Sequence, residues 1–332
     1  MNDRYPTRFS GARHRAGVVV ISVLALSLSN AAHSTPLGAA ATRATGCGTA
    51  SPGSTTLSLT FQRHVRTVIV DVPTSGASQS KRALVLNLHG SGSTALEQEE
   101  FTGMNITAND DDFIVAYPQG LIPDGSGFDW NVPGVALFGG RPVPANAADD
   151  VKFLTSLVGV LEHKYCVNPH EVYATGFSGG AREASQLACD ESSVFAAAAP
   201  VSGLRRPTPC PATRAVPIIW FHGSADPIDP FAGNGQRYWT YSVTTAAKDW
   251  AAQDHCATKA AKSTPDQNVK LTTYSRCADG ASVELYEIVG EGHEWPGGPT
   301  MPSSITSYLG AQSDAANANT LIWSFFQAHP RS

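Results

Sequence analysis

Charged residues are scarce in this sequence of 332 residues, in which Asp, Glu, Lys and Arg together make up 15%. No block of like charges occurs, which argues against a disordered tail or a nucleic-acid-binding arm. The formal net charge of −5 is mildly acidic, so we expect neither nucleic acid nor an anionic membrane surface as a partner. Hydrophobic residues make up 42% of the chain, a composition typical of a globular protein with one large core.

The N-terminus lacks an apolar run long enough for a comfortable membrane span, which needs about 20 residues. Residues 16–28 are almost wholly apolar, follow a basic start, and precede the small-x-small site Ala32-His33-Ser34. This order predicts a secretory signal peptide over 1–34, a secreted or extracellular protein and no stable membrane insertion. An uncleaved membrane anchor is the alternative.

The six cysteines contain no C-x-x-C pair, which argues against a zinc site or a redox pair. We also expect no other metal and no cofactor. An even number of cysteines in an exported chain implies disulfides. Their order along the chain favours Cys189–Cys210 and Cys256–Cys277, which leaves Cys47–Cys166.

Beyond an N-terminal leader over residues 35–55, residues 56–332 have the length and pattern of one catalytic domain. Apolar and alternating runs predict strands, and apolar residues at helical spacing predict helices between them. The predicted strands cover 56–61, 66–72, 83–88, 113–117, 171–175, 194–201, 216–221, 269–275 and 283–289, and the helices 147–165, 181–189, 236–252 and 315–328. This alternation predicts an α/β fold with a mostly parallel twisted sheet and helices on both faces.

The G-x-S-x-G stretch at Gly176–Gly180 lies between a predicted strand and a predicted helix. That context is required of a nucleophile elbow, in which a serine sits on a sharp, strained turn. Glycines on either side allow the strand and the helix to approach closely. We therefore assign Ser178 as a candidate nucleophile, against the alternative of an ordinary Gly/Ser-rich loop.

A serine hydroxyl needs a base within hydrogen-bonding reach, and the base needs an orienting carboxylate. The α/β-hydrolase order is serine, then acid, then histidine. Asp226 and His293 follow Ser178 in that order, and each comes just after a predicted strand. We predict His293 as the general base and Asp226 as the acid, with Asp229 as the main rival and an Asp-Pro turn as the structural alternative.

The oxyanion of an acyl-transfer intermediate needs preorganised backbone N–H donors. One donor is expected at Gly179, directly after the nucleophile. The other is expected in the His89-Gly90-Ser91-Gly92 loop, where Ser91 is our choice and Gly92 the alternative. The nearby His89, like His222, is expected to hydrogen-bond the loop backbone.

The segment 120–146 is dense in Gly and Pro, and so long a loop is usually functional in a compact domain. It contains Trp130, and a second tryptophan, Trp295, lies close to His293. We hypothesise that both indoles contact substrate. The alternative is that they are packing residues.

Eight short segments of the chain resemble those of one enzyme family. They are LNLHGSGS (86–93), AYPQG (116–120), FDWNVPG (128–134), DDVKFL (149–154), VYATGFSGGA (172–181), LACD (187–190), WFHGSADPIDP (220–230) and GEGHEWPGG (290–298). The chain resembles the secreted serine esterases that group polyhydroxybutyrate depolymerase-like proteins with feruloyl and acetylxylan esterases, of the carbohydrate esterase family 1 type.

The resemblance implies an α/β-hydrolase fold, no metal, and a triad of Ser178, Asp226 and His293. It agrees with the assignment made from the residues alone. We therefore expect a carboxylic-ester hydrolase that works through an acyl-enzyme. The expected substrate is a small-molecule or oligomeric ester of polyhydroxyalkanoate, feruloyl or acetyl type. A lipase or peptidase of the same fold is an alternative, and a non-catalytic binding protein is a further one.

Overall fold

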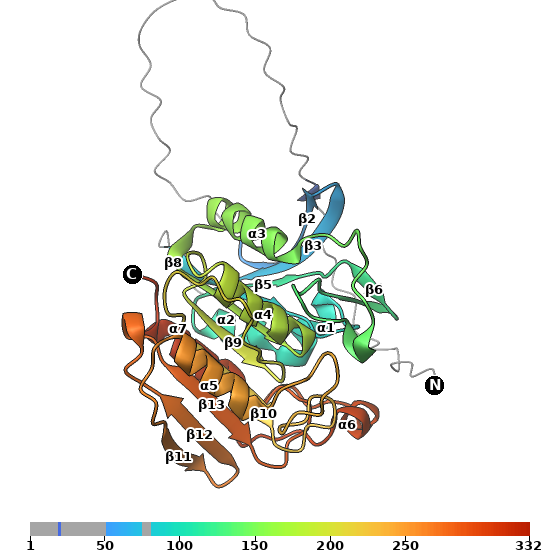
Figure 1. The fold of residues 1–332 in the computed structure, drawn as a ribbon. Coiled ribbons are helices and arrows are strands. Elements are labelled where there is room, and N and C mark those ends of the chain that lie inside the picture. The colour runs from blue at the N-terminus through green and yellow to red at the C-terminus, as the bar shows by residue number, and fades with distance from the viewer. Residues whose placement is uncertain (1–18, 21–50, 75–80) are drawn as a thin grey trace, which may run out of the picture.

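The computed structural model describes residues 19–20, 51–74 and 81–332 of the chain (Figure 1). The predicted signal peptide and leader lie outside the described residues, apart from Val19–Val20 and residues 51–55. The predicted boundary at residue 56 stays a prediction, and the first long strand of the domain begins ahead of it, at Gly53.

An 11-stranded sheet forms the centre of the molecule, in the order β1-β2-β3-β5-β4-β8-β9-β10-β13-β12-β11. From β5 to β13 neighbouring strands run parallel, whereas β2–β3–β5 and β13–β12–β11 pair antiparallel at the two sides. This confirms the mostly parallel sheet. The strands are β1 (Val19–Val20), β2 (Gly53–Phe61), β3 (His64–Val72), β4 (Arg82–Leu88), β5 (Ile114–Pro118), β8 (Val167–Phe177), β9 (Ala197–Val201), β10 (Ile218–Gly223), β11 (Ala261–Asp266), β12 (Val269–Tyr274) and β13 (Val283–Ile288).

Helices cover both faces of the sheet, because alternate residues of each central strand point to opposite sides. Val85 of β4 belongs to the apolar cluster beneath α1, α2 and α7, whereas Leu84 and Leu86 belong to the cluster beneath α3 and α4. A third cluster lies beneath α5. The helices are α1 (Ala95–Thr102), α2 (Met104–Asp110), α3 (Asp150–Tyr165), α4 (Gly179–Asp190), α5 (Val243–Gln253), α6 (Ser303–Leu309) and α7 (Ala318–Ala328) (Figure 1).

Several short elements differ from the sequence-based prediction. The helix predicted over 236–252 is wrong in its first part, because α5 begins at Val243, where the Ser242 side chain caps it by accepting from the Thr245 N–H. The polar helix α1 was not predicted, although a capping box formed by Thr94 and Glu97 begins it. The loop 120–146 contains a two-stranded hairpin, β6 (Ile122–Asp124) and β7 (Gly127–Asp129).

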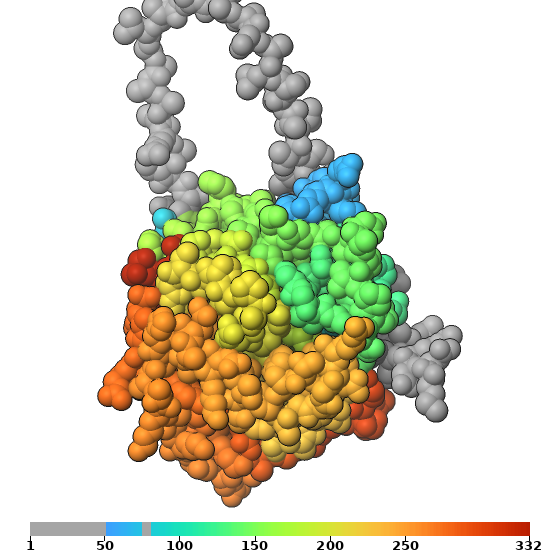
Figure 2. Space-filling view, viewed as in Figure 1, coloured from blue at the N-terminus to red at the C-terminus, as the bar shows by residue number. Residues whose placement is uncertain are grey.

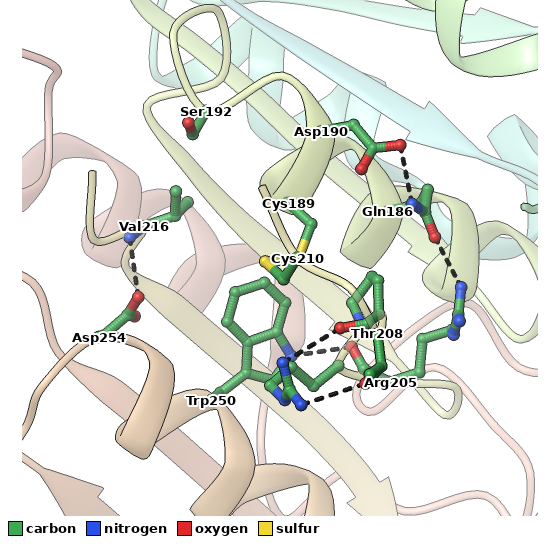
Figure 3. Close-up of a disulfide and its surroundings, with 12 residues drawn as sticks. Gln186, Cys189, Asp190, Ser192, Arg205, Thr208, Cys210, Val216, Trp250 and Asp254 are labelled. Carbon is green, nitrogen blue, oxygen red and sulfur yellow. Dashed lines mark hydrogen bonds between the residues drawn. A yellow bond between two sulfur atoms is a disulfide. The ribbon is translucent and has the colours of Figure 1, made fainter. Parts of the chain in front are cut away.

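Two predicted disulfides are confirmed, Cys189–Cys210 and Cys256–Cys277. The first ties the end of α4, the helix that follows Ser178, to the segment leading into β10. Around it, Trp250 donates to the Arg205 carbonyl, and the Arg205 guanidinium donates to Gln186 of α4 (Figure 3). Cys166 is also disulfide-bonded. Its predicted partner Cys47 lies outside the described residues, so that pairing stays a prediction.

Candidate active site

Ser178 lies on the sharp turn between β8, which ends at Phe177, and α4, which begins at Gly179. Its backbone angles, φ 52° and ψ −113°, are strained for a residue with a side chain, and such strain costs about 1–3 kcal/mol. A Cβ at Gly180 would lie 2.2 Å from the Leu88 carbonyl oxygen, and one at Gly176 would lie 2.7 Å from the Gly180 backbone. The two glycines are therefore required for helix, turn and neighbouring strand to pack this closely.

Asp226 and His293 meet at the carboxyl ends of β10 and β13, which are adjacent parallel strands. His293 Nδ1 lies 2.7 Å from Asp226 Oδ2. The other carboxylate oxygen, Oδ1, accepts the backbone N–H groups of Ile228 and Asp229, each at 2.8 Å. The turn thus holds Asp226 in place, and Asp226 in turn fixes the orientation of the imidazole.

Asp229, the rival for the role of acid, has a different partner. Its Oδ2 forms a buried ion pair with the Arg182 guanidinium at 2.5 Å, and its carbonyl lies 2.7 Å from His222 Nε2. His222 Nε2 also lies 3.3 Å from Asp226 Oδ2. This division of contacts favours Asp226 as the group that orients His293.

Electrostatics favour the ionised form of this pair. Burial raises the pKa of Asp226, but the charge of His293 and hydrogen bonds from His222 and His293 outweigh it and hold that pKa below its usual value. Burial lowers the pKa of His293, but the Asp226 charge and hydrogen bond reverse this and raise it above the usual value. Asp226 therefore stays a carboxylate and stabilises an imidazolium that forms beside it.

Ser178 directly follows Phe177, whose ring centroid lies 4.7 Å from that of His293. Within the described residues, no hydrogen bond joins Ser178 Oγ to His293 Nε2. Both side chains are almost fully buried, at 7% and 2% exposed. The hydrogen bond between a catalytic serine and its base is commonly long in structures without substrate and shortens when substrate binds.

The backbone of Ser91 lies beside Gly179, as an oxyanion hole requires. A Cβ at Gly179 would lie 3.1 Å from Ser91 N and 2.5 Å from Ser91 Oγ. The alternative donor, Gly92, already donates its N–H to the Phe128 carbonyl at 3.1 Å. This contact favours Ser91 over Gly92 as the second donor.

The hairpin β6–β7 and the residues after it hold the Ser91 loop in place. Besides the Gly92 bond, the Phe128 N–H donates to the Ser93 carbonyl at 2.9 Å. Trp130 Nε1 donates to the His89 carbonyl at 2.8 Å, and the two rings lie 4.7 Å apart. These hydrogen bonds join the loop 120–146 and the Ser91 loop into one hydrogen-bonded unit.

Asp129 and Arg141 add an ionic contact to this unit and were not singled out in the sequence. Arg141 contacts the carboxylates of Asp129 and Asp124 at 2.9 and 2.8 Å. Burial raises the pKa of Asp129 to about 6, although hydrogen bonding by the Ser91 side chain opposes this. In the sequence, only the length of the loop 120–146 pointed to a role for these residues. The contacts of Arg141 with Asp124 and Asp129 join separate turns of that loop and cannot be read from residue spacing.

The two candidate tryptophans lie in different surroundings. Trp130 is 3% exposed and packs in a core cluster, but it also lines a small pocket together with Ser91 and Gly179, so a substrate contact stays a hypothesis for it. Trp295 is fully buried in the core, and its Nε1 donates to Asn319 at 2.9 Å. That burial is what the packing alternative expects, and we do not propose Trp295 as a substrate contact.

His89 has the structural surroundings expected of it. Its Nδ1 lies 2.8 Å from the Gly90 carbonyl, and its Nε2 accepts the Gly120 N–H at 2.9 Å. Burial lowers the pKa of His89 to about 4, so the ring is neutral and accepts at Nε2. It joins the loop after β4 to the loop after β5.

Within residues 51–74 and 81–332, no group of three or more His, Cys, Asp or Glu side chains is arranged to hold a metal ion. No helix among the described residues is both long and apolar enough to cross a membrane.

A parallel sheet with a serine elbow, followed by acid and histidine at the ends of later strands, defines the α/β-hydrolase class. The acetyl xylan esterase from Aspergillus awamori has this fold in common with the chain, with a TM-score of 0.52 at 17% identity over 77% of this chain and 99% of that one. Thermogutta terrifontis esterase 2 gives a TM-score of 0.52 at 14% identity over 83% and 95%. No family model matches the sequence.

Sequence relatives define the family within that class. NocK of Nocardia uniformis subsp. tsuyamanensis, named as an esterase, is 31% identical over 248 residues, which cover 68% of this chain and 69% of NocK. Feruloyl esterase B of Piromyces equi is 29% identical over 243 residues, 69% of this chain and 42% of that protein. Poly(3-hydroxyalkanoate) depolymerase C of Paucimonas lemoignei is 26% identical over 65% of this chain and 56% of its own length. The chain belongs to the esterases of the α/β-hydrolase family.

Proposed function

We propose that the protein is a secreted serine carboxylic-ester hydrolase that works through an acyl-enzyme. The contact between His293 Nδ1 and Asp226 Oδ2 carries this proposal, because it joins residues 67 positions apart beside a serine held on a strained turn. A binding protein of this fold would have no need of an oriented histidine at that place.

In the proposed reaction, Ser178 Oγ attacks the ester carbonyl carbon while His293 Nε2 takes its proton. The backbone N–H groups of Ser91 and Gly179 hold the resulting oxyanion. The C–O bond to the alcohol breaks, and His293 returns the proton to the leaving oxygen. Water then attacks the acyl carbon while His293 Nε2 takes a proton from it. The bond between the acyl carbon and Ser178 Oγ breaks, His293 returns the proton to that oxygen, and the carboxylic acid leaves.

The proposed substrates are small or oligomeric esters of feruloyl, acetyl or hydroxyalkanoate type. These classes appear in the names of the similar proteins described above. The chain spans only 42% of the length of Feruloyl esterase B, so the substrate of that whole protein is a proposal for this chain. A small pocket lies beside the candidate oxyanion donors Ser91 and Gly179, and we propose it as the place where the ester enters.

Export from the cell is supported by the two disulfides and by the order of basic, apolar and small residues over 1–34. N-terminal sequencing of the protein recovered from the medium tests the proposed cleavage. An intact residue 1 on the secreted protein would contradict it.

Turnover of p-nitrophenyl acetate by the wild type and by Ser178→Ala tests the reaction. We expect the variant to lose at least about 1000-fold in kcat, since the nucleophile cannot be replaced by its neighbours. Diisopropyl fluorophosphate should add one mass label to the wild type and none to Ser178→Ala.

Ser185→Ala is the matched control, because Ser185 lies on the same helix and its hydroxyl bonds only backbone groups. It should keep both the label and the turnover. An inactive wild type, or equal turnover by wild type and Ser178→Ala, would rule out the serine esterase.

A further inference from the structure

A second serine, Ser202, lies beside the reacting serine at the end of the neighbouring strand. Phe177 and Val201 are the last residues of β8 and β9, and they pair in register. Ser178 and Ser202 therefore follow adjacent parallel strands at the same level. Both have φ 52°, a value that residues with a side chain rarely adopt. The Ser178 N–H donates to the Val201 carbonyl at 2.9 Å, so the two strained turns are joined directly.

The Ser202 side chain reaches the segment 290–298, which carries the predicted base and is called the histidine loop below. Ser202 is 1% exposed, and its hydroxyl donates to the Glu294 carbonyl at 3.1 Å. Glu294 directly follows His293, so this hydrogen bond holds the backbone next to the imidazole. The bond spans from the end of β9 to the loop after β13, across β10, which lies between these strands in the sheet.

The backbone around Ser202 is held on both sides. Its own N–H donates to a carbonyl of β10 at 2.9 Å. A Cβ at Gly203 would lie 2.3 Å from the Ser178 carbonyl oxygen, so the next residue packs against the elbow itself. Farther on, the Arg205 carbonyl accepts from Trp250 Nε1, where the segment after β9 lies beside α5 (Figure 2, yellow next to orange). Ser202 is therefore a rigid support for the histidine loop.

The other hydrogen bonds of the histidine loop run away from the elbow. The His293 N–H donates to the Leu309 carbonyl at 2.6 Å, and Trp295 Nε1 donates to Asn319 at 2.9 Å. Among the described residues, the Ser202 hydroxyl makes the one hydrogen bond that runs from this loop toward the turns after β8 and β9. The distance between base and nucleophile thus depends on this hydroxyl more than on any other polar contact of the loop.

We propose that Ser202 is a positioning residue that holds His293 at the right place relative to Ser178. The proposal rests on the esterase function proposed above, in which His293 Nε2 must reach Ser178 Oγ. Without the hydroxyl, the buried Glu294 carbonyl loses its donor and the histidine loop shifts. A displacement of about 1 Å between reacting groups can cost on the order of 100-fold in rate. In this role Ser202 acts only through the histidine.

Two variants delete the hydroxyl in different ways. Ser202→Ala keeps a side chain at φ 52°, whereas Ser202→Gly also relieves the backbone strain. For both we expect kcat on p-nitrophenyl acetate, measured well below the Tm, to fall roughly tenfold or more while KM changes less than about twofold. The two losses should be alike, because both variants lack the same donor.

Ser185→Ala is the matched control for a buried hydroxyl. Ser185 is fully buried and donates to a backbone carbonyl, that of Ala181 at 2.8 Å, but this bond lies within α4. We expect this variant to lower the Tm and to leave kcat of the folded enzyme unchanged. A merely structural role of Ser202 would give the same result.

A double-mutant cycle with His293→Ala assigns the loss to the histidine. Without the imidazole there is no base to position, so adding Ser202→Ala should change the residual kcat/KM by less than about twofold. If Ser202 acted on the elbow or on the oxyanion donors instead, its effect would persist in the His293→Ala background.

Unchanged kcat in Ser202→Gly would overturn the proposal, and so would a loss of equal size with and without the imidazole. If Ser202→Ala does not fold, Ser202→Gly carries the test, because glycine adopts φ 52° without strain. Failure of both variants to fold would make the role of Ser202 structural and overturn the proposal as well. A wild type that does not hydrolyse p-nitrophenyl acetate would instead contradict the esterase function itself.

Discussion

Asp226 and His293 meet directly at the ends of two adjacent strands, whereas the Ser91 loop is held by a hairpin outside the main sheet. On the first side, one side-chain contact of 2.7 Å and two backbone bonds to Asp226 define the geometry. On the second side, the Ser91 loop depends on backbone bonds to β7, on the Trp130 indole and on the Asp129–Arg141 pair. The acid–base side is therefore set by the sheet, and the oxyanion side by a loop.

The acid–base side and the oxyanion side should therefore respond differently to mutation. A change on the acid–base side removes a catalytic group or its orienting partner outright. A change on the oxyanion side displaces donors that stay present, so the loss should be smaller and confined to the transition state. Graded substitutions on each side test this difference directly.

The largest effect is expected for Asp226→Asn. It leaves the shape of the turn but favours the wrong imidazole tautomer, so kcat/KM should fall by about 10 000-fold. Asp229→Asn should lose far less activity, although it leaves Arg182 unpaired and should lower stability by about 3–5 kcal/mol. Steady-state kinetics on p-nitrophenyl acetate and thermal unfolding of both variants provide the measurement. A larger loss of kcat/KM in Asp229→Asn would transfer the role of acid to Asp229.

An intermediate effect is expected for Trp130→Phe. The change keeps a ring against His89 but deletes the indole N–H that donates to the His89 carbonyl. We expect kcat to fall roughly tenfold with little change in KM, because a displaced oxyanion donor weakens mainly the transition state.

Trp295→Phe is the matched control for this measurement, since it also deletes one buried indole hydrogen bond, to Asn319. It should lower the free energy of unfolding by about 1–2 kcal/mol and leave kcat of the folded enzyme unchanged. If the two variants lose kcat equally, Trp130 has no particular role in holding the oxyanion loop.

The smallest effect concerns Glu291, two positions before His293. Burial raises its pKa to about 9, against a hydrogen bond from the Ser313 N–H that lowers it. Between its usual value of 4.5 and about 9, the folded protein keeps a proton that the unfolded chain has released, so stability falls as pH rises through this window. Glu291→Gln removes that dependence.

We therefore expect the Tm of Glu291→Gln, relative to the wild type, to be higher at about pH 8 than at about pH 5. Thermal unfolding at both values measures this. Glu162→Gln on α3 serves as the control and should give the same difference at both. A Tm difference for Glu291→Gln that does not vary with pH would mean that no proton is retained at this carboxyl.

The main sheet and the order of the candidate triad could be predicted because they depend on local signals. Apolar runs of strand length, glycines at Gly176 and Gly180, and polar residues just after strands are all visible within a few positions. The strand β4, for example, is wholly buried and is a near-continuous apolar run in the sequence. The choice between Asp226 and Asp229 could not be made in this way, because both lie in the same Asp-Pro-Ile-Asp-Pro turn.

Short polar elements escaped prediction for a related reason. The helix α1 has no apolar face that would reveal its period, and the hairpin β6–β7 pairs within a loop dense in Gly and Pro. Their positions follow from contacts with distant segments, such as that of Phe128 with Ser93. Propensity carries little information where tertiary contacts decide the local conformation.

Residue type and spacing along the chain were enough to predict the fold class and to favour the elbow at Ser178 and the two described disulfide pairings. The contacts of His293 with Asp226 and of Asp229 with Arg182 became visible only in the folded chain. So did the surroundings of the two buried tryptophans, since Trp130 lines the pocket whereas Trp295 donates to Asn319. The physical reason is distance along the chain. Hydrogen bonds and ion pairs act over a few ångströms, and which residues come that close is set by how the loops pack over the ends of the strands.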